Sequence, residues 1–242
     1  MTNPSKDRRS FLRRAVTIVP VSTLAAGATV TQVACSDQQS APAAKDPAKS
    51  YTPTFFTQDE WAFIHKAVAL LIPNDDMGPG AVEAGVPEFI DRQMETPYGH
   101  GKLWYMQGPF RPESPPELGY QTNMAPRDIY RHGMAACDAW CKQQHGGKGF
   151  AALDDDTRLQ VLKDMEAGKA KFENMSAKLF FSTLLANTKE GFFADPMYGG
   201  NKGMTGWKQI GFPGARADFM DWIDQPNKPY PYGPVSIQGD KA

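Results

Sequence analysis

The sequence lacks the short motifs by which proteins usually hold redox groups. Only three of its 242 residues are cysteines, and no Cys-x-x-Cys-His run for covalent haem occurs. The nearest approach to a phosphate-binding loop, Gly78-Pro79-Gly80, has neither the third glycine nor the preceding strand of a dinucleotide site. We therefore expect this chain to bind no flavin, nicotinamide or haem of its own.

Residues for nucleophilic catalysis and metal binding are also sparse. No Gly-x-Ser-x-Gly elbow occurs. Asp75 and Asp76 could form an acid and base pair, but a helix-ending turn with Asn74 and Gly78 explains them more simply. The histidines lack the close paired spacing of a zinc or iron site and are scattered at His65, His100, His132 and His145. We predict no catalytic residue and no metal ligand.

Charge argues against nucleic-acid binding. The whole chain has 26 basic and 27 acidic residues. Residues 1–35 hold five of the basic residues and one of the acidic ones, so the rest of the chain carries a net charge of −5. It shows no basic patch of the kind that a phosphate backbone attracts. A mildly acidic, soluble domain fits these numbers.

The N-terminus carries an export pattern. Arg8 and Arg9, followed by Phe11, Leu12 and a further arginine, match the twin-arginine signal. The charge-free run from Ala15 to Ala34 is too rich in Thr, Ser, Gly and Pro for a good membrane-spanning helix. We predict a signal peptide over residues 1–35, the twin-arginine translocase as a partner, and a periplasmic location.

The segment around Cys35 leaves two kinds of signal cleavage open. Gln32-Val33-Ala34-Cys35 partly resembles a lipoprotein box, whereas Ala26-Gly27-Ala28 offers an ordinary cleavage site. Residues 36–54, rich in Ser, Ala, Pro, Gln and Lys, have the composition of a flexible tether, which favours lipidation of Cys35. Membrane attachment would then come from one acylated residue, which is a modest anchor, or from a membrane-associated complex.

Residues 55–242 are predicted to form one compact, mainly α domain. Few segments alternate with a period of two, and the length suits a single sizeable core. The capping and periodicity signals predict five helices: from a capping box at Thr57 to Leu71; a short one from Pro87; Arg127–Gln144; one from Asp155–Thr157 with Leu159, Leu162 and Met165 inside; and one from Ser176. The last is the most apolar, so we place it at the centre of the core.

Long loops are expected between and after these helices. Residues 96–126 interleave prolines with aromatic residues, as in a surface loop wrapped onto apolar surface. Phe192 to Ala215 combines six glycines with aromatic anchors, which predicts a long, ordered and functional loop. A last short helix is expected at 216–223, and the proline-rich tail from Gln225 should lie extended.

Cys137 and Cys141 lie four residues apart, on one face of a predicted helix. Free thiols are unusual in an oxidising compartment. Three states are open for them. The two cysteines could be buried reduced thiols beside Trp140, or they could form a sterically awkward disulfide within the helix. In the third state, one of them forms a disulfide to a partner chain.

Two segments carry a resemblance to a known family. The first is Pro79-Gly80-Ala81. The second runs from Asp195 to Ala215, with the sequence DPMYGGNKGMTGWKQIGFPGA, and is the more specific of the two. Over about residues 55–215, the chain resembles the gluconate 2-dehydrogenase subunit 3 family.

The resemblance implies a non-catalytic accessory subunit. Such a subunit would bind a large FAD-containing flavoprotein of the glucose-methanol-choline family, help it mature and carry it through the twin-arginine system. A multihaem cytochrome c, holding haem c, would be the third member and pass electrons onward. The rival hypothesis is a stand-alone periplasmic sugar-binding lipoprotein or enzyme, which would hold a sugar between the loop at Trp104–Tyr120 and the glycine-rich loop.

The residues that match the family are expected to contact the partner, with aromatic anchors filling pockets and glycines allowing close approach. Closure of the subunit's own core is the alternative role. Both roles hold if Trp207 and Phe212 pack inward while the turn from Tyr198 to Asn201 faces outward. The expected partner contacts are Tyr198, Gly199, Gly200, Asn201, Trp207, Gly211, Phe212, Pro213 and Gly214.

Overall fold

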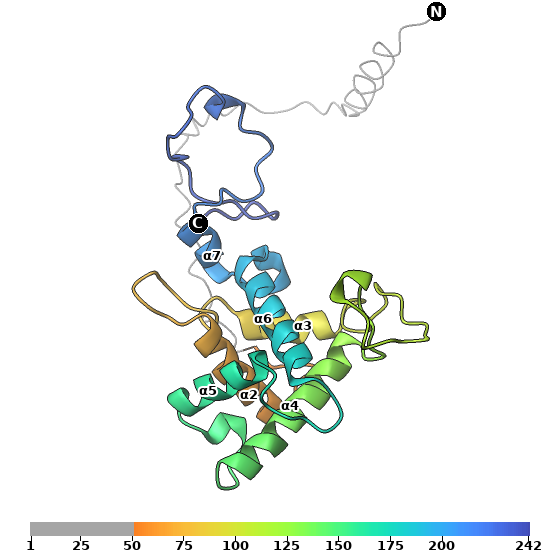
Figure 1. The fold of residues 1–242 in the computed structure, drawn as a ribbon. Coiled ribbons are helices and arrows are strands. Elements are labelled where there is room, and N and C mark those ends of the chain that lie inside the picture. Colours follow the sequence, from red (N-terminus) through yellow and green to blue (C-terminus); the bar gives the residue numbers. More distant parts are fainter. Residues whose placement is uncertain (1–50) are drawn as a thin grey trace, which may run out of the picture. The chain divides into compact units, whose positions relative to one another are not determined.

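The computed structural model describes residues 51–242 (Figure 1). The predicted signal peptide, with Arg8, Arg9, Phe11 and Leu12, lies outside the described residues, and so does Cys35. Over the described part of the chain the structure has six α-helices and no β-strand, which confirms the mainly α fold. None of these helices combines the length and apolarity needed to cross a membrane.

The first two helices begin as their capping residues predict. Helix α2 (Gln58–Leu71) starts with the expected capping box, in which Thr57 and Glu60 each accept a hydrogen bond from the other's backbone N–H. Helix α3 (Val86–Met94) has Pro87 in its first turn, as expected, and buries Phe89 and Ile90.

The next two helices also lie where the sequence places them. Helix α4 (Pro126–Gln144) begins one residue before its predicted start, and helix α5 (Asp155–Glu166) begins after Asp154, whose carboxylate accepts from Thr157 N. One of the predicted inward residues is assigned wrongly, because Leu159 is 36% exposed. Val161, Leu162 and Met165 form the buried face of α5 instead, because Leu159 points about a quarter-turn away from that stripe.

Helix α6 (Ala177–Phe193) forms the centre of the core, as predicted. It packs against α3, α4 and α5, and Figure 1 shows it running between these helices. Its buried Asn187 accepts a hydrogen bond from the Tyr130 hydroxyl and donates to the Tyr98 hydroxyl, so it ties α6 to α4 and to the loop after α3. A buried amide with partners on both atoms costs little and fixes how these elements pack.

The glycine-rich stretch is ordered, but the expectation of one long loop is wrong. Helix α6 continues to Phe193, and three further helical turns follow: η3 (Pro196–Tyr198), η4 (Lys202–Met204) and α7 (Thr205–Ile210). Left-handed residues separate these turns at Gly199, Asn201, Met204 and Gly211. Two of these four joints are glycines, which adopt a left-handed backbone without the strain that a side chain adds.

Irregular segments fill the remaining positions. Between α3 and α4 the chain has a single 3-10 turn, η1 (Pro116–Leu118), and the Trp104 ring packs against Tyr98 and Tyr120 with centroid distances of 5.8 and 4.4 Å. Another 3-10 turn, η2 (Phe150–Ala152), precedes α5. The short helix expected at 216–223 is reduced to the turn η5 (Met220–Trp222), and the chain after it has no helix.

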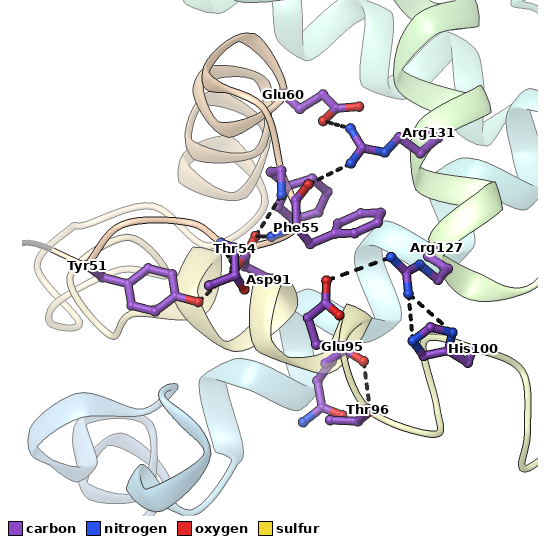
Figure 2. A network of polar contacts seen from close by, with 12 residues as sticks. Tyr51, Thr54, Phe55, Glu60, Asp91, Glu95, Thr96, His100, Arg127 and Arg131 are labelled. Carbon is purple, nitrogen blue, oxygen red and sulfur yellow. Dashed lines mark hydrogen bonds and ion pairs between the residues drawn. The ribbon is translucent and has the colours of Figure 1, made fainter.

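The end of the predicted tether is ordered against the helical domain. Tyr51 and Thr54, which we assigned to the flexible segment 36–54, donate hydrogen bonds to the carboxylate of Asp91 on α3 (Figure 2). The backbone N–H groups of Phe55 and Phe56 donate to the other oxygen of Asp91, at 3.1 and 2.9 Å. The folded domain therefore begins at least four residues earlier than predicted.

Phe55 is held from the opposite side by two arginines of α4. The guanidinium carbons of Arg127 and Arg131 lie 4.9 and 4.3 Å from the centre of its ring, and Arg131 also donates to the carbonyl of Phe55 at 2.6 Å. Arg131 also pairs with Glu60 of α2 (Figure 2). We call residues 51–56 the entry segment, since they fix where the preceding chain joins the domain.

Candidate functional site

The stretch Asp195–Ala215 lies over the C-terminal end of α6, and glycine makes the closest approaches there. A side-chain carbon added to Gly200 would stand 2.2 Å from the carbonyl oxygen of Gly191, and one added to Gly206 would stand 2.2 Å from that of Phe192. Both distances are far below van der Waals contact. These two glycines therefore serve packing within the subunit.

Asn201 joins the end of α6 to the start of α7. It is fully buried and left-handed, its amide donates to the carbonyl of Ala194 at 2.9 Å, and its amide oxygen accepts from the N–H of Gly206 at 2.8 Å. The Trp207 indole N–H donates to the carbonyl of Phe193 at 2.8 Å. Together these bonds satisfy two end carbonyls of α6 and an N-terminal N–H of α7, which the helices themselves leave unpaired.

The two segments that carry the family resemblance meet in space. The N–H of Lys202 donates to the carbonyl of Ala84 at 2.9 Å, close after Pro79-Gly80-Ala81, and the Gln209 side chain donates to the carbonyl of Pro79 at 3.2 Å. Glu88 on α3 is buried and pairs with Arg92 and Lys202, each at 2.5 Å. The early segment and the late stretch thus form one structural unit with α3.

The outward side of this unit includes exposed apolar side chains, and our assignment of inward and outward residues is partly wrong. Trp207 packs inward as expected, but Phe212 is 45% exposed. Of the turn expected to face outward, only Tyr198 does so, at 47% exposed, whereas Gly199, Gly200 and Asn201 are buried. Backbone bonding explains the difference, because the turn wraps onto α6 and leaves only its aromatic side chain outside.

The other expected contact residues lie at the far end of α7. Gly211 is exposed and left-handed, and it ends the helix. Pro213 and Gly214 are half-buried, and their backbone groups meet Val235 near the C-terminus. The expected contact residues omit three further exposed apolar side chains of the same stretch, Phe193, Met197 and Ile210. Their place beside the motif residues in the sequence is the signal that could have found them.

The cysteine pair is buried. Cys137 and Cys141 are free thiols in the structure, with no disulfide within α4, and neither is exposed. A hydrogen bond to Cys141, together with burial, raises the pKa of the Cys137 thiol well above its ordinary value. A protonated, buried thiol is a poor nucleophile, so this pair resembles core residues more than a reactive site.

Metal-ligand groups do not converge in the described part of the chain. Residues 51–242 contain no group of three or more His, Cys, Asp or Glu side chains that could hold a metal ion. His65 lies edge-on to Trp61, and burial followed by the charge of Lys66 lowers its pKa. A neutral imidazole packed on an aromatic ring has a structural explanation.

Comparison with known proteins agrees with the geometry. The model of the family described as gluconate 2-dehydrogenase subunit 3 matches residues 58–214. The chain belongs to this family. The matched range includes Pro79-Gly80-Ala81 and all of the late stretch except Ala215, since it ends at Gly214. No curated protein and no solved structure gave a significant match. As a member of this family, the protein is an accessory subunit of a dehydrogenase complex.

Proposed function

We propose that this subunit binds the FAD-containing catalytic subunit of a gluconate, sugar or polyol dehydrogenase, helps it mature and carries it to the periplasm. The catalytic subunit would be a flavoprotein of the glucose-methanol-choline family, and a multihaem cytochrome c would take its electrons. Family membership supports the role in a complex. The twin-arginine pattern at Arg8 and Arg9 supports export, and Cys35 offers a lipid anchor besides the complex itself.

The observation that supports a docking role most directly is a set of exposed apolar side chains on a backbone that buried hydrogen bonds hold in place. We call the exposed side chains Phe193, Met197, Tyr198, Ile210 and Phe212 the motif face. They are between 40% and 62% exposed, although the backbone beneath them is held by buried bonds of Asn201 and Trp207. Exposed apolar side chains on an ordered backbone are frequent at protein interfaces, where aromatic anchors supply most of the affinity.

Replacing Tyr198 tests this surface with little risk to the fold, because the side chain is half exposed and makes no hydrogen bond in the described structure. We expect Tyr198→Ala to weaken binding to the co-expressed flavoprotein about 30-fold, equivalent to about 2 kcal/mol for an interface anchor. Affinity is measured by titrating purified flavoprotein and following complex formation, and thermal unfolding confirms that the subunit is intact.

Tyr105→Ala is the matched control, since Tyr105 is 77% exposed on the loop between α3 and α4. It should bind like the wild type. Equal affinities for Tyr198→Ala and Tyr105→Ala would contradict the docking role of the motif face. Native protein that purifies alone and oxidises a sugar by itself would contradict the accessory role and favour the stand-alone alternative.

Export provides a separate prediction. We expect Arg8→Lys with Arg9→Lys to retain both this subunit and the flavoprotein in the cytoplasm, because the partner would depend on this chain's signal. Fractionation followed by immunoblotting of both proteins measures the result. Arg13→Lys with Arg14→Lys makes the same two charge-conserving substitutions outside the arginine pair and should export normally. A flavoprotein that still reaches the periplasm would show that it travels independently.

A further inference from the structure

Residues 215–242, which we call the C-terminal arm, lie beyond the end of the family match at Gly214. Two hydrogen bonds attach the arm to the matched region. Val235 N donates to the carbonyl of Pro213 at 3.2 Å, and Ile237 N donates to the carboxylate of Asp195 at 2.7 Å. Within the arm, Ala215 N donates to the carbonyl of Val235 at 2.7 Å. The segment around Val235 and Ile237 is therefore held against the matched region.

Gly214 shows that the matched region accommodates this arm. A side-chain carbon at Gly214 would lie 2.2 Å from the carbonyl oxygen of Val235, and its φ of +76° also favours glycine. The same carbon would lie 3.0 Å from the ring of Trp207. The last glycine of the motif thus allows Val235 to approach the body of the domain.

Aromatic stacking holds the interior of the arm. The Arg216 guanidinium lies over the rings of Tyr230 and Tyr232, at 5.0 and 5.4 Å from their centres, and donates to the carbonyl of Gly233 at 2.7 Å. Tyr230 in turn packs edge-on against Phe219 and Trp222, with centroid distances of 5.4 and 5.7 Å. These contacts give a segment with little regular structure a defined shape.

The turn η5 and the residues that flank it carry aromatic, aliphatic and acidic side chains, each kind at a spacing of three residues, and we call each set a row. Phe219 and Trp222 form the row that packs on Tyr230, whereas Met220 and Ile223 form a second row that is 71% and 63% exposed. The third row is acidic and exposed, and none of its members forms an ion pair with another described residue: Asp218, Asp221 and Asp224.

We infer that the C-terminal arm is a second docking element, which inserts Met220 and Ile223 into an apolar pocket of the flavoprotein rimmed by lysine or arginine. This inference rests on the proposed function. The arm follows Phe212 in the chain and is bonded back to Pro213 and Asp195, and we assign both to one partner. The negative charge of the acidic row repels an anionic membrane surface and repels the same row of a second copy. It attracts a rim of lysine or arginine side chains.

The test measures the affinity of full-length subunit for the co-expressed, purified flavoprotein, identified by its flavin absorbance. We expect Met220→Ala with Ile223→Ala to weaken binding at least 10-fold. The control, Leu103→Ala with Leu118→Ala, removes two side chains that are 70% and 67% exposed on another loop, and it should bind like the wild type. Equal binding by the arm variant and the wild type would overturn the inference.

The acidic row has its own variant. We expect Asp221→Asn with Asp224→Asn to weaken binding several-fold at low salt and to reduce the salt dependence of the affinity. Asp59→Asn with Asp156→Asn, at exposed positions of α2 and α5, should leave both quantities unchanged. An unchanged salt dependence for Asp221→Asn with Asp224→Asn would contradict the proposal that the partner's pocket has a basic rim.

The other possible occupants of the arm are separated by three measurements. Failure of the wild-type subunit to bind the flavoprotein would overturn the proposed function together with the arm's role. Wild-type binding with an unaffected arm variant overturns only the arm's role. Self-association in sedimentation, or binding to vesicles of phosphatidylcholine and phosphatidylglycerol, that Met220→Ala with Ile223→Ala abolishes would assign the arm to a second copy or to a membrane.

Discussion

Gly206→Ala should destabilise the subunit by about 3 kcal/mol, the cost of forcing extra atoms into a packed site. Helix propensity alone predicts the opposite sign, because alanine is favoured over glycine by about 1 kcal/mol within a helix. Gly206 lies in α7, but its added carbon would stand 2.2 Å from the carbonyl oxygen of Phe192 and 3.1 Å from a ring atom of Phe193. A backbone carbonyl at the end of α6 cannot rotate away as a flexible side chain can.

The free energy of unfolding in urea measures this effect. Gly203→Ala is the control, since nothing lies within 4 Å of its added carbon and only its φ of +65° is unfavourable. That left-handed conformation costs about 1 kcal/mol for alanine. The excess loss in Gly206→Ala over the control is the cost of the close approach. Equal or greater stability of Gly206→Ala relative to the wild type would show that α7 does not pack this tightly on α6.

Asp91→Asn should cost about 2–4 kcal/mol, because it leaves buried backbone N–H groups facing an amide that is itself a donor. The carboxylate is fully buried and accepts five hydrogen bonds from the entry segment, three of them from backbone N–H groups of Thr54, Phe55 and Phe56. Burial and the hydrogen bond to Asp91 raise the pKa of Tyr51 to about 12, so its hydroxyl remains a donor. The variant should release residues 51–56, which limited proteolysis detects.

The stabilising effect of Asp91 depends on pH. Burial by itself raises the pKa of the Asp91 carboxyl, but the hydrogen bonds from Phe56, Thr54 and Tyr51 outweigh it and hold the pKa below its ordinary value. A lowered pKa in the folded state means that the stabilisation is complete above the unfolded value, about pH 4, and is lost as the pH falls through the folded pKa. The stability difference between the wild type and Asp91→Asn should therefore be constant near neutral pH and shrink in acid.

Asp154→Asn provides the matched control for Asp91→Asn. Asp154 is an exposed N-cap carboxylate, and asparagine caps a helix about as well as aspartate. We expect little change in stability at neutral pH. A similar small change for Asp91→Asn would show that the entry segment is held by Phe55 and its two arginines and not by the carboxylate.

Several elements could be predicted from the sequence because their causes are local. The capping box at Thr57 and Glu60 and Pro87 in the first turn of α3 act within one helical turn, so their positions match the structure closely. The start of α5 was also placed correctly, although its cap is Asp154 and not a residue of 155–157. The prediction that Leu159 faces the core was wrong for a reason that lies in the tertiary structure. Periodicity gives the existence of an apolar stripe, but which of two adjacent rows of α5 faces the core depends on α6.

The candidate site was less predictable than the helices. The motif from Asp195 to Ala215 could be recognised in the sequence, and so could its resemblance to a family. Which of its residues point outward depends on bonds to distant elements, such as Asn201 to the end of α6 and Lys202 to the chain near Ala84. The contact of Asp195 with Ile237 spans 42 positions, and a local pattern contains no trace of it.

By itself, the sequence determined the mainly α fold, the centre of its core and the family, because capping, periodicity and motifs are recorded within a few neighbouring residues; the export signal stays a prediction. Only the tertiary structure decided that Asn201 is internal and Tyr198 external, that Phe212 faces outward, and that Tyr51 belongs to the folded domain. The physical reason is that the burial of a side chain depends on contacts with segments remote in the sequence. These contacts form only when the whole core is assembled.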